Sequence, residues 1–333
     1  MKIENEKLLR VLKSVSPAVD KSGVIEQSSV VYFDGNTVRT FNGEISIVSK
    51  LKSDIVGGID AAGFTSLISK LEKGKIKVKI KKGSLKIISG STRALLKMEK
   101  VKMPEIDISG KAWNNLPVNF CEGINLVRIS APSSDITPEL SQVFVIKDKA
   151  LSCDNFRATQ FLLSESINQE IAISKTFADI LYQYDVIQYT HSDDWVHFKD
   201  SSGTVLSCRI PSSKYPHKKV FALFNVEGAE LKLPENFSRI IDRVGSILLG
   251  IQDDKLISLI FAKGQITLKG KSESGYVKEE IRSDYSGESF SVQVNPKFLA
   301  EVLKYECKVK VSKSCLLVQG TNFNHIISLQ SEE

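Results

Sequence analysis

The stretch LPVNF at residues 116–120 recurs, with one substitution, as LPENF at residues 233–237. Both stretches are predicted helix starts, since proline is tolerated in the first turn, where its missing N–H has no intrahelical partner. The two copies lie 117 residues apart in a chain of 333 residues, close to a third of its length. The sequence therefore predicts an internal repeat, a feature that decides the fold wherever it occurs.

Six segments carry apolar residues at spacings of i, i+3, i+4 and i+7, which place them on one face of a helix. The anchor residues of the six segments are Leu8, Phe64, Phe120, Phe177, Phe237 and Phe298. Successive anchors are 56, 56, 57, 60 and 61 residues apart. The third segment has Gly123 at its i+3 position, and the sixth has Glu301 there. Such even spacing predicts six copies of one module.

Strand patterns between these helices repeat as well. Alternating runs joined by turn residues predict hairpins at residues 75–89, 185–200 and 306–320, each followed by a third strand. Short strands also precede several helices, as at Ile171–Ile173. The module is therefore β-α-β-β-β, with a length of 56–61 residues.

One such module leaves unpaired sheet edges, so two modules are expected to share a core. The predicted fold class is α+β, with three tandem similar domains of two modules each. The predicted boundaries give residues 1–109, 110–221 and 222–333.

Composition excludes several classes of protein. The N-terminus is charged where a signal peptide is apolar, and no run approaches the ~20 apolar residues of a membrane span, so a cytoplasmic protein is expected. The five cysteines are scattered without a CxxC motif, so neither zinc nor disulfides are predicted. The net charge of +6 permits an anionic partner without requiring one.

Two histidines flank an acidic pair in the segment His191–His197, which is one candidate for a metal or acid–base cluster. Its spacing spans a hairpin turn rather than one helix face, so turn chemistry around Asp193 and Asp194 is the favoured interpretation. No phosphate-binding loop, metalloprotease motif or nucleophile elbow occurs in the sequence. We expect no catalytic residues, no metal and no cofactor.

Several stretches resemble the bacterial beta sliding clamp family, at low identity but along the whole chain. Tyr285-Ser286-Gly287 followed by the segment Val294–Leu303 is similar to the family's last strand and helix. The segment Cys153–Arg157 is similar to a Thr-Asp-Gly-His-Arg stretch of the family, and Arg209–Pro211 stands where the family has a Phe-Pro-Asp-Tyr turn. The resemblance implies a homodimeric ring that encircles duplex DNA, with helices lining the pore and sheets outside. Its partners would be a DNA polymerase and a clamp loader, which bind through a short peptide.

Basic residues on the predicted helices are the candidates for DNA contact in such a pore, where they would attract phosphates without reading bases. They are Lys7, Arg10, Lys13, Lys70, Lys73, Arg128, Lys175, Arg239, Arg243, Lys297 and Lys304. The densest basic run, Lys75 to Lys81, alternates with apolar residues on a predicted strand. We interpret that run as a solvated or edge-protecting face on the outside of the ring.

The resemblance also implies an apolar pocket for the partner peptide. Its predicted residues are Leu140, Cys153, Asn155, Phe156, Arg157, Ala158, Pro216, Ile326 and Ile327. The polar C-terminus, Ser328–Glu333, departs from the apolar end of the family, and the positive net charge departs from its usual acidity. Both departures favour a divergent member, and a phage origin is one interpretation. The alternative function is a repeat-built scaffold that binds proteins and does not encircle DNA.

Overall fold

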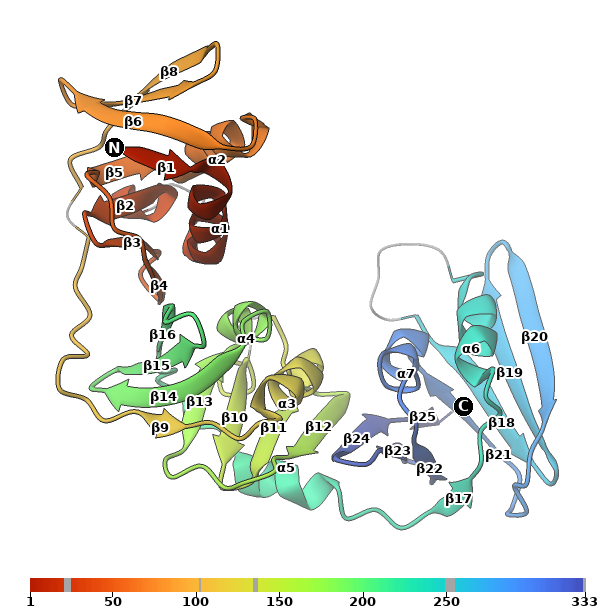
Figure 1. Cartoon of the computed structure of the whole chain (residues 1–333). Coiled ribbons are helices and arrows are strands. Elements are labelled where there is room, and N and C mark those ends of the chain that lie inside the picture. The colour runs from red at the N-terminus through yellow and green to blue at the C-terminus, as the bar shows by residue number, and fades with distance from the viewer. Residues whose placement is uncertain (21–24, 102, 134–136, 249–254, 332–333) are drawn as a thin grey trace. The chain divides into compact units, whose positions relative to one another are not determined.

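The computed structural model describes residues 1–20, 25–101, 103–133, 137–248 and 255–331 of the chain (Figure 1). These residues form seven α-helices: α1 (Asn5–Val15), α2 (Ala61–Lys70), α3 (Phe120–Val127), α4 (Lys175–Leu181), α5 (His217–Leu223), α6 (Phe237–Gly245) and α7 (Pro296–Val302). Short 3-10 helices add η1 (Ser16–Ala18), η2 (Glu26–Ser29) and η3 (Arg128–Ser130). None of the described helices has the length and apolar character needed to cross a membrane.

The first twelve strands are β1 (Lys2–Glu4), β2 (Val30–Asp34), β3 (Thr37–Phe41), β4 (Ile45–Lys50), β5 (Val56–Asp60), β6 (Lys75–Lys81), β7 (Ser84–Ser89), β8 (Thr92–Lys97), β9 (Asn114–Asn115), β10 (Gln142–Ile146), β11 (Lys149–Cys153) and β12 (Arg157–Leu162). The remaining strands are β13 (Ile171–Ser174), β14 (Val186–Ser192), β15 (Trp195–Asp200), β16 (Val205–Arg209), β17 (Ala229–Leu231), β18 (Ile257–Ala262), β19 (Gln265–Ser272), β20 (Gly275–Arg282), β21 (Phe290–Val294), β22 (Lys308–Val311), β23 (Cys315–Gln319), β24 (Phe323–Ser328) and β25 (Gln330–Ser331).

The six predicted modules are confirmed by this element order. Each has one strand, one helix and three further strands, beginning with β1-α1-β2-β3-β4 and ending with β21-α7-β22-β23-β24. Apart from the short 3-10 helices, the described elements outside the pattern are the helix α5 and the terminal strand β25. The six predicted helices did not include α5.

Neighbouring modules exchange their first strands. β1 of the first module pairs with β6 of the second, while β5 of the second pairs with β2 of the first. β9 and β13 are exchanged in the same way, as are β17 and β21. Because each module completes the sheet of its neighbour, two modules form one unit of packing. This explains physically why modules are used in pairs.

Two eight-stranded sheets connect strands of different predicted domains. β4 pairs with β16, with partners from Val48↔Val205 to Ile45↔Cys208. β12 pairs with β24, with partners from Arg157↔Ile327 to Phe161↔Phe323. Their orders are β5-β2-β3-β4-β16-β15-β14-β9 and β13-β10-β11-β12-β24-β23-β22-β17.

These shared sheets divide the chain differently from the predicted domains. One compact unit holds Met1–Cys121 with Asp179–Pro211, and the other holds Glu122–Ala178 with Ser212–Glu333. The predicted middle domain, residues 110–221, is therefore split between the two units. Its C-terminal boundary also falls inside α5, whose Val220 and Phe221 pack with strand residues of the middle third. We propose that the last domain begins after this helix.

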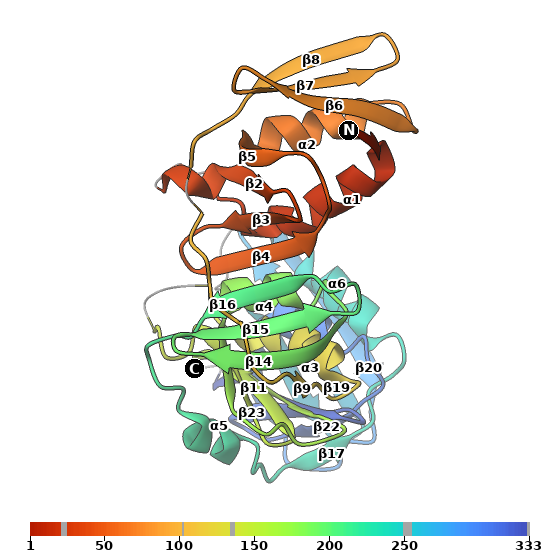
Figure 2. The same cartoon turned by 60° about the vertical axis from the view of Figure 1, so that its left-hand side comes forward.

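The helix faces follow the predicted spacing in five of the six modules. The faces of α1 and α6 are buried throughout, as at Leu8 and Phe237. On α3, Gly123 is buried, and a Cβ there would lie only 2.7 Å from the ring of Phe161, so the missing side chain permits the close approach. The anchor expected on α7 is wrong, because α7 buries Leu299 and Val302 while Phe298 is half-buried. Within each compact unit, helices also pair with each other, α1 with α2 (Figure 2) and α6 with α7 (Figure 1).

Two fully buried histidines form part of the polar core. The ring nitrogens of His197 lie 2.7 Å from the Ser192 hydroxyl and 2.8 Å from the Ser207 hydroxyl. His325 lies 2.8 Å from the hydroxyl of Thr159, in the sheet that joins β12 to β24. Burial lowers the pKa of His197 to about 4 and the pKa of His325 to about 3. Both side chains therefore favour the neutral form in the folded protein.

We expect the folded protein to lose stability between pH 6.5 and pH 4. An unfolded histidine has a pKa near ~6.5 and takes up a proton that folded His197 excludes, so acid favours unfolding. From pH 7.5 to pH 5 this linkage removes about 2 kcal/mol per buried histidine. Urea unfolding at the two pH values tests this with His197→Gln, which should lower the difference by about 2 kcal/mol. An unchanged difference in that variant would contradict the assignment.

Candidate functional site

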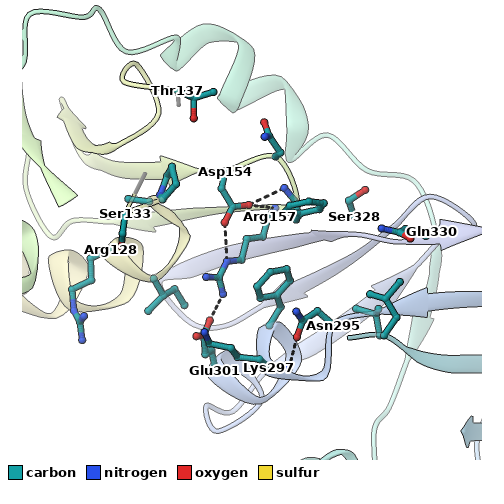
Figure 3. Close-up of a pocket in the computed structure, with 18 of the residues that line it drawn as sticks. Arg128, Ser133, Thr137, Asp154, Arg157, Asn295, Lys297, Glu301, Ser328 and Gln330 are labelled. Carbon is teal, nitrogen blue, oxygen red and sulfur yellow. Dashed lines mark hydrogen bonds and ion pairs between the residues drawn. The ribbon is translucent and has the colours of Figure 1, made fainter. Parts of the chain in front are cut away.

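A cavity of about 880 Å³ lies in the second compact unit (Figure 3). This volume lies within the ~300–1,000 Å³ range of ordinary ligand sites. Its walls come from the turn between β11 and β12, from η3 and the segment after it, from α7, and from the end of β24 with β25. The residues that line it include Arg128, Asp154, Asn155, Phe156, Arg157, Lys175, Asn295, Lys297, Phe298, Glu301, Ser328 and Gln330.

Arg157 organises the cavity. Its Nε donates to Asp154 Oδ2 at 3.2 Å, and its Nη1 donates to Glu301 of α7. The guanidinium also lies over the ring of Phe298, 4.1 Å from the ring centre. Two carboxylates and an aromatic face thus compensate the positive charge of Arg157, whose side chain is only 10% exposed. The interaction holds the β11–β12 turn against α7.

The turn itself is fixed by Asp154. Its Oδ1 accepts hydrogen bonds from the backbone N–H groups of Phe156 and Arg157, both at 2.8 Å. This side chain–backbone pattern closes the turn and fixes the direction of the next side chains. On the opposite wall, the Asn295 side chain accepts from the N–H of Lys297 at 2.9 Å and so caps the start of α7.

Two aromatic rings supply the apolar part of the cavity wall. Phe156 is 50% exposed, and its ring centre lies 6.4 Å from that of Phe298. An exposed phenyl group beside a second ring offers contact area for an apolar side chain. Ser328 and Gln330 are exposed nearby and contribute polar groups. The polar C-terminus therefore forms part of this wall, up to the last described residue.

An apolar cluster lies behind the turn. Its buried residues include Cys153, Ala158 and Ile326, and Leu140 packs against them. Tyr215, just before α5, belongs to the same cluster and stacks on Phe144 with ring centres 5.4 Å apart. Burial raises the pKa values of Tyr215 and of the Cys153 thiol above their usual ranges. Tyr215 and α5 thus fill space on this side of the sheet.

Only some of the nine predicted pocket residues line the cavity, and the others are buried behind it or lie before α5. Asn155, Phe156 and Arg157 line the cavity. Cys153, Ala158, Ile326 and Leu140 belong to the apolar cluster, Ile327 is fully buried in β24, and Pro216 is half-buried before α5. The sequence interpretation missed the opposite wall on α7, although Glu301 at an apolar helix position was a usable signal.

The predicted DNA-binding residues occupy three kinds of position. Lys7, Arg10 and Lys13 on α1, Lys70 on α2, and Arg239 and Arg243 on α6 are exposed helix residues. Lys73 and Lys304 follow helices, and Lys73 pairs with Glu6 at 3.3 Å. Arg128, Lys175 and Lys297 line the cavity instead. Arg243 forms a bidentate ion pair with Glu279, in which its Nε donates to Oε1 at 2.7 Å and its Nη2 donates to Oε2 at 2.8 Å. These hydrogen bonds raise the pKa of Arg243.

The histidine and aspartate segment is a hairpin, as the favoured interpretation predicted. Asp193 and Asp194 form the turn between β14 and β15, and His197 is a buried core residue. The described residues contain no group of three or more histidine, cysteine or acidic side chains arranged to hold a metal ion.

Comparison with known proteins identifies the architecture. The family model for the C-terminal domain of the DNA polymerase III beta subunit matches residues 230–316. A search of curated proteins by sequence gives no match.

Solved structures match the chain along its length. A sliding clamp (DNA polymerase III subunit beta) from Bartonella birtlesii, bound to griselimycin, is similar with a TM-score of 0.88, at 15% identity, over 100% of this chain and 99% of that one. The DNA polymerase III subunit beta of Pseudomonas aeruginosa has a TM-score of 0.85 at 14% identity, with both chains fully covered. The pol III beta protein of Caulobacter crescentus has a TM-score of 0.85 at 18% identity over 99% of each chain. Residues 230–316 therefore match the model of the C-terminal domain of the DNA polymerase III beta subunit, and the chain as a whole has the fold of these bacterial sliding clamps.

Proposed function

We propose that the protein is a DNA sliding clamp, a non-enzymatic ring that encircles duplex DNA and tethers a replicative polymerase to it. The observation that carries this proposal is the agreement of all six modules with the clamp fold, together with the family match in the last third. A ring stays on DNA by topology, so its contacts with phosphates can be weak and exchangeable. A protein with this role would work on replicating DNA in the cytoplasm.

The strand pairing favours closure by a second copy. The last strand of the first module, β4, pairs with the last strand of the fourth module, β16. The last strand of the third module, β12, pairs in the same way with that of the sixth, β24. The corresponding last strands of the fifth and second modules, β20 and β8, are edge strands among the described residues. We propose that β20 of each copy pairs with β8 of the other, which closes a two-fold ring.

Leu96→Asp is expected to weaken this dimer at least tenfold. Leu96 is half-buried on β8. When β8 pairs with β20 of the other copy, a carboxylate at this position would lose its bound water and gain no hydrogen-bond or charge partner in exchange. Leu95→Asp is the matched control, because the adjacent side chain points to the opposite face of the strand. Light scattering between 0.1 and 10 µM (roughly the span set by such a weakening) should give monomers for Leu96→Asp and dimers for Leu95→Asp. A wild-type protein that stays monomeric at all concentrations would refute the closure.

The exposed cations of α1 and α6 are the proposed DNA contacts. Arg10 and Arg239 are exposed and form no ion pair among the described residues. Arg243 is the weaker candidate, since Glu279 already holds it. Reversal of exposed charges usually costs little folding stability, so their effect on DNA can be measured separately.

Loaded onto nicked circular plasmid by its clamp loader with ATP, the protein should co-elute with the DNA and be released when a restriction enzyme linearises it. Arg10→Glu with Arg239→Glu should lower the retained fraction several-fold, because a repelled duplex is encircled less readily. Lys52→Glu with Lys263→Glu makes the same charge change on exposed residues outside the helices and should have no effect. Retention that survives linearisation would favour a scaffold bound to DNA without encirclement.

The cavity beside Arg157 is the proposed site for the polymerase and loader peptide. Its four cations, Arg128, Arg157, Lys175 and Lys297, outnumber the two carboxylates, Asp154 and Glu301. We therefore expect an extended peptide without net positive charge, carrying an apolar side chain that packs between Phe156 and Phe298. The buried cluster behind the turn would support this surface rather than form it.

Phe156→Ala is expected to lower affinity for this peptide about tenfold, the usual scale for loss of an aromatic anchor. The measurement is fluorescence anisotropy with a labelled C-terminal peptide of the polymerase from the same source. Tyr305→Ala removes another exposed aromatic ring of the same compact unit, outside the cavity, and should bind normally. Equal loss in the two variants would mean that the peptide binds elsewhere.

A further inference from the structure

The strands β1, β6, β7 and β8 form one four-stranded sheet (Figure 1). This sheet has one apolar face and one strongly cationic face. The apolar face is buried at Ile76, Val78, Leu85 and Ile87. The opposite face, called the lysine face below, carries Lys2, Lys75, Lys77, Lys79, Lys81, Lys86, Arg93 and Lys97. Glu4 is the one carboxylate on these strands. The face thus has eight cations and one anion, a formal charge of +7, which exceeds the +6 of the whole chain.

The strand register places like charges directly opposite each other on the lysine face. Lys2 is the Cα partner of Lys77, and Lys79 is the Cα partner of Lys86. Such like-charged cross-strand pairs destabilise a sheet. The sheet therefore carries an electrostatic cost that a bound polyanion would remove.

Few of these charges are neutralised within the described chain. Lys75 lies 3.8 Å from Glu4, and Lys97 lies 3.2 Å from Glu99. The other six cations form no ion pair among the described residues. On the edge strand β8, Leu95, the partner of Lys86, lies on the same face and is 64% exposed.

Protection of a sheet edge does not account for this arrangement. Lysines guard edge strands against pairing with other chains. However, β7 lies between β6 and β8 along its whole length, and β1 covers β6 from Lys75 to Lys77. Edge protection therefore applies on β6 only to Lys79 and Lys81, and it leaves Lys86 unexplained.

We propose that the lysine face binds the phosphate backbone of duplex DNA, at a second site separate from the proposed pore. The seven-residue β6 is roughly 20 Å long at ~3.3 Å per residue. Duplex DNA carries on the order of ten phosphate charges over that length. Alternate lysines follow one another at about 7 Å along the strand, and they supply point charges without base readout.

The chemistry of the face favours a duplex over other polyanions. The cations extend over four strands, about 14 Å across, which suits the two backbones of a duplex better than the single row of an acidic peptide. The strands of this sheet carry no aromatic side chain on which unpaired bases could stack, and stacking is a main source of single-strand affinity. The contact would be independent of sequence and strongly dependent on salt.

The test uses the full-length protein, without loader or ATP, and a labelled, covalently closed circular duplex plasmid. A closed ring cannot thread onto a duplex circle, so binding reports contact outside the pore. We expect salt-dependent binding in a filter-binding assay. Lys77→Gln with Lys79→Gln and Lys81→Gln should weaken it at least tenfold and reduce the slope of log affinity against log salt by about 3.

Two controls make the outcome decisive. Lys52→Gln with Lys232→Gln and Lys263→Gln removes the same charge from other exposed positions and should change affinity less than twofold. Arg10→Glu with Arg239→Glu should leave this binding intact, which separates it from the proposed pore. Unchanged affinity in the lysine-face variant would overturn the site. Tighter binding of poly-glutamate than of DNA at equal charge concentration would overturn the choice of DNA as its partner.

Discussion

Backbone hydrogen bonds between strands distant in the sequence hold this fold together. A single β-α-β-β-β module ends in open sheet edges, and unpaired edges are both unstable and prone to association. The exchange of first strands closes one edge in each pair of modules, as with β1 and β5. The pairing of last strands closes another, as with β4 and β16. All of the helix faces and the cavity depend on these sheets for their positions.

The pairing between last strands of modules also suggests how two copies would assemble. Within one chain the rule is satisfied twice, and among the described strands it leaves β8 and β20 without such partners. In the proposed dimer each copy supplies the strand that the other lacks, so the rule that builds the monomer also predicts the dimer. Helix residues such as Arg10 need no precise partner in such a ring, because enclosure rather than affinity keeps DNA in place.

Periodicity in the sequence predicted the modules because it reflects burial. Leu8 and Phe237 recur at the module spacing because each is packed under a sheet. The prediction failed where a side chain has another role. Phe298 stands at the expected spacing but faces the cavity under Arg157. α5 was missed because it is a single short helix outside the repeat, preceded by Pro216.

The candidate site was only half predictable, for a geometric reason. The resemblance located the β11–β12 turn, but the partner of Arg157 is Glu301, 144 residues away. Local patterns do not reveal which distant helix a turn will meet. The lysine run of β6 was visible in the sequence. The pairing of β6 with β1 and β7, which places like-charged residues such as Lys2 opposite its lysines, was not.

Electron cryo-microscopy of the purified protein tests the central claim most directly. The account predicts a two-fold ring in which backbone hydrogen bonds join β8 of one copy to β20 of the other, around a hole lined by the exposed faces of α1 and α6. A monomer, an open filament, or a dimer joined through other strands would contradict it.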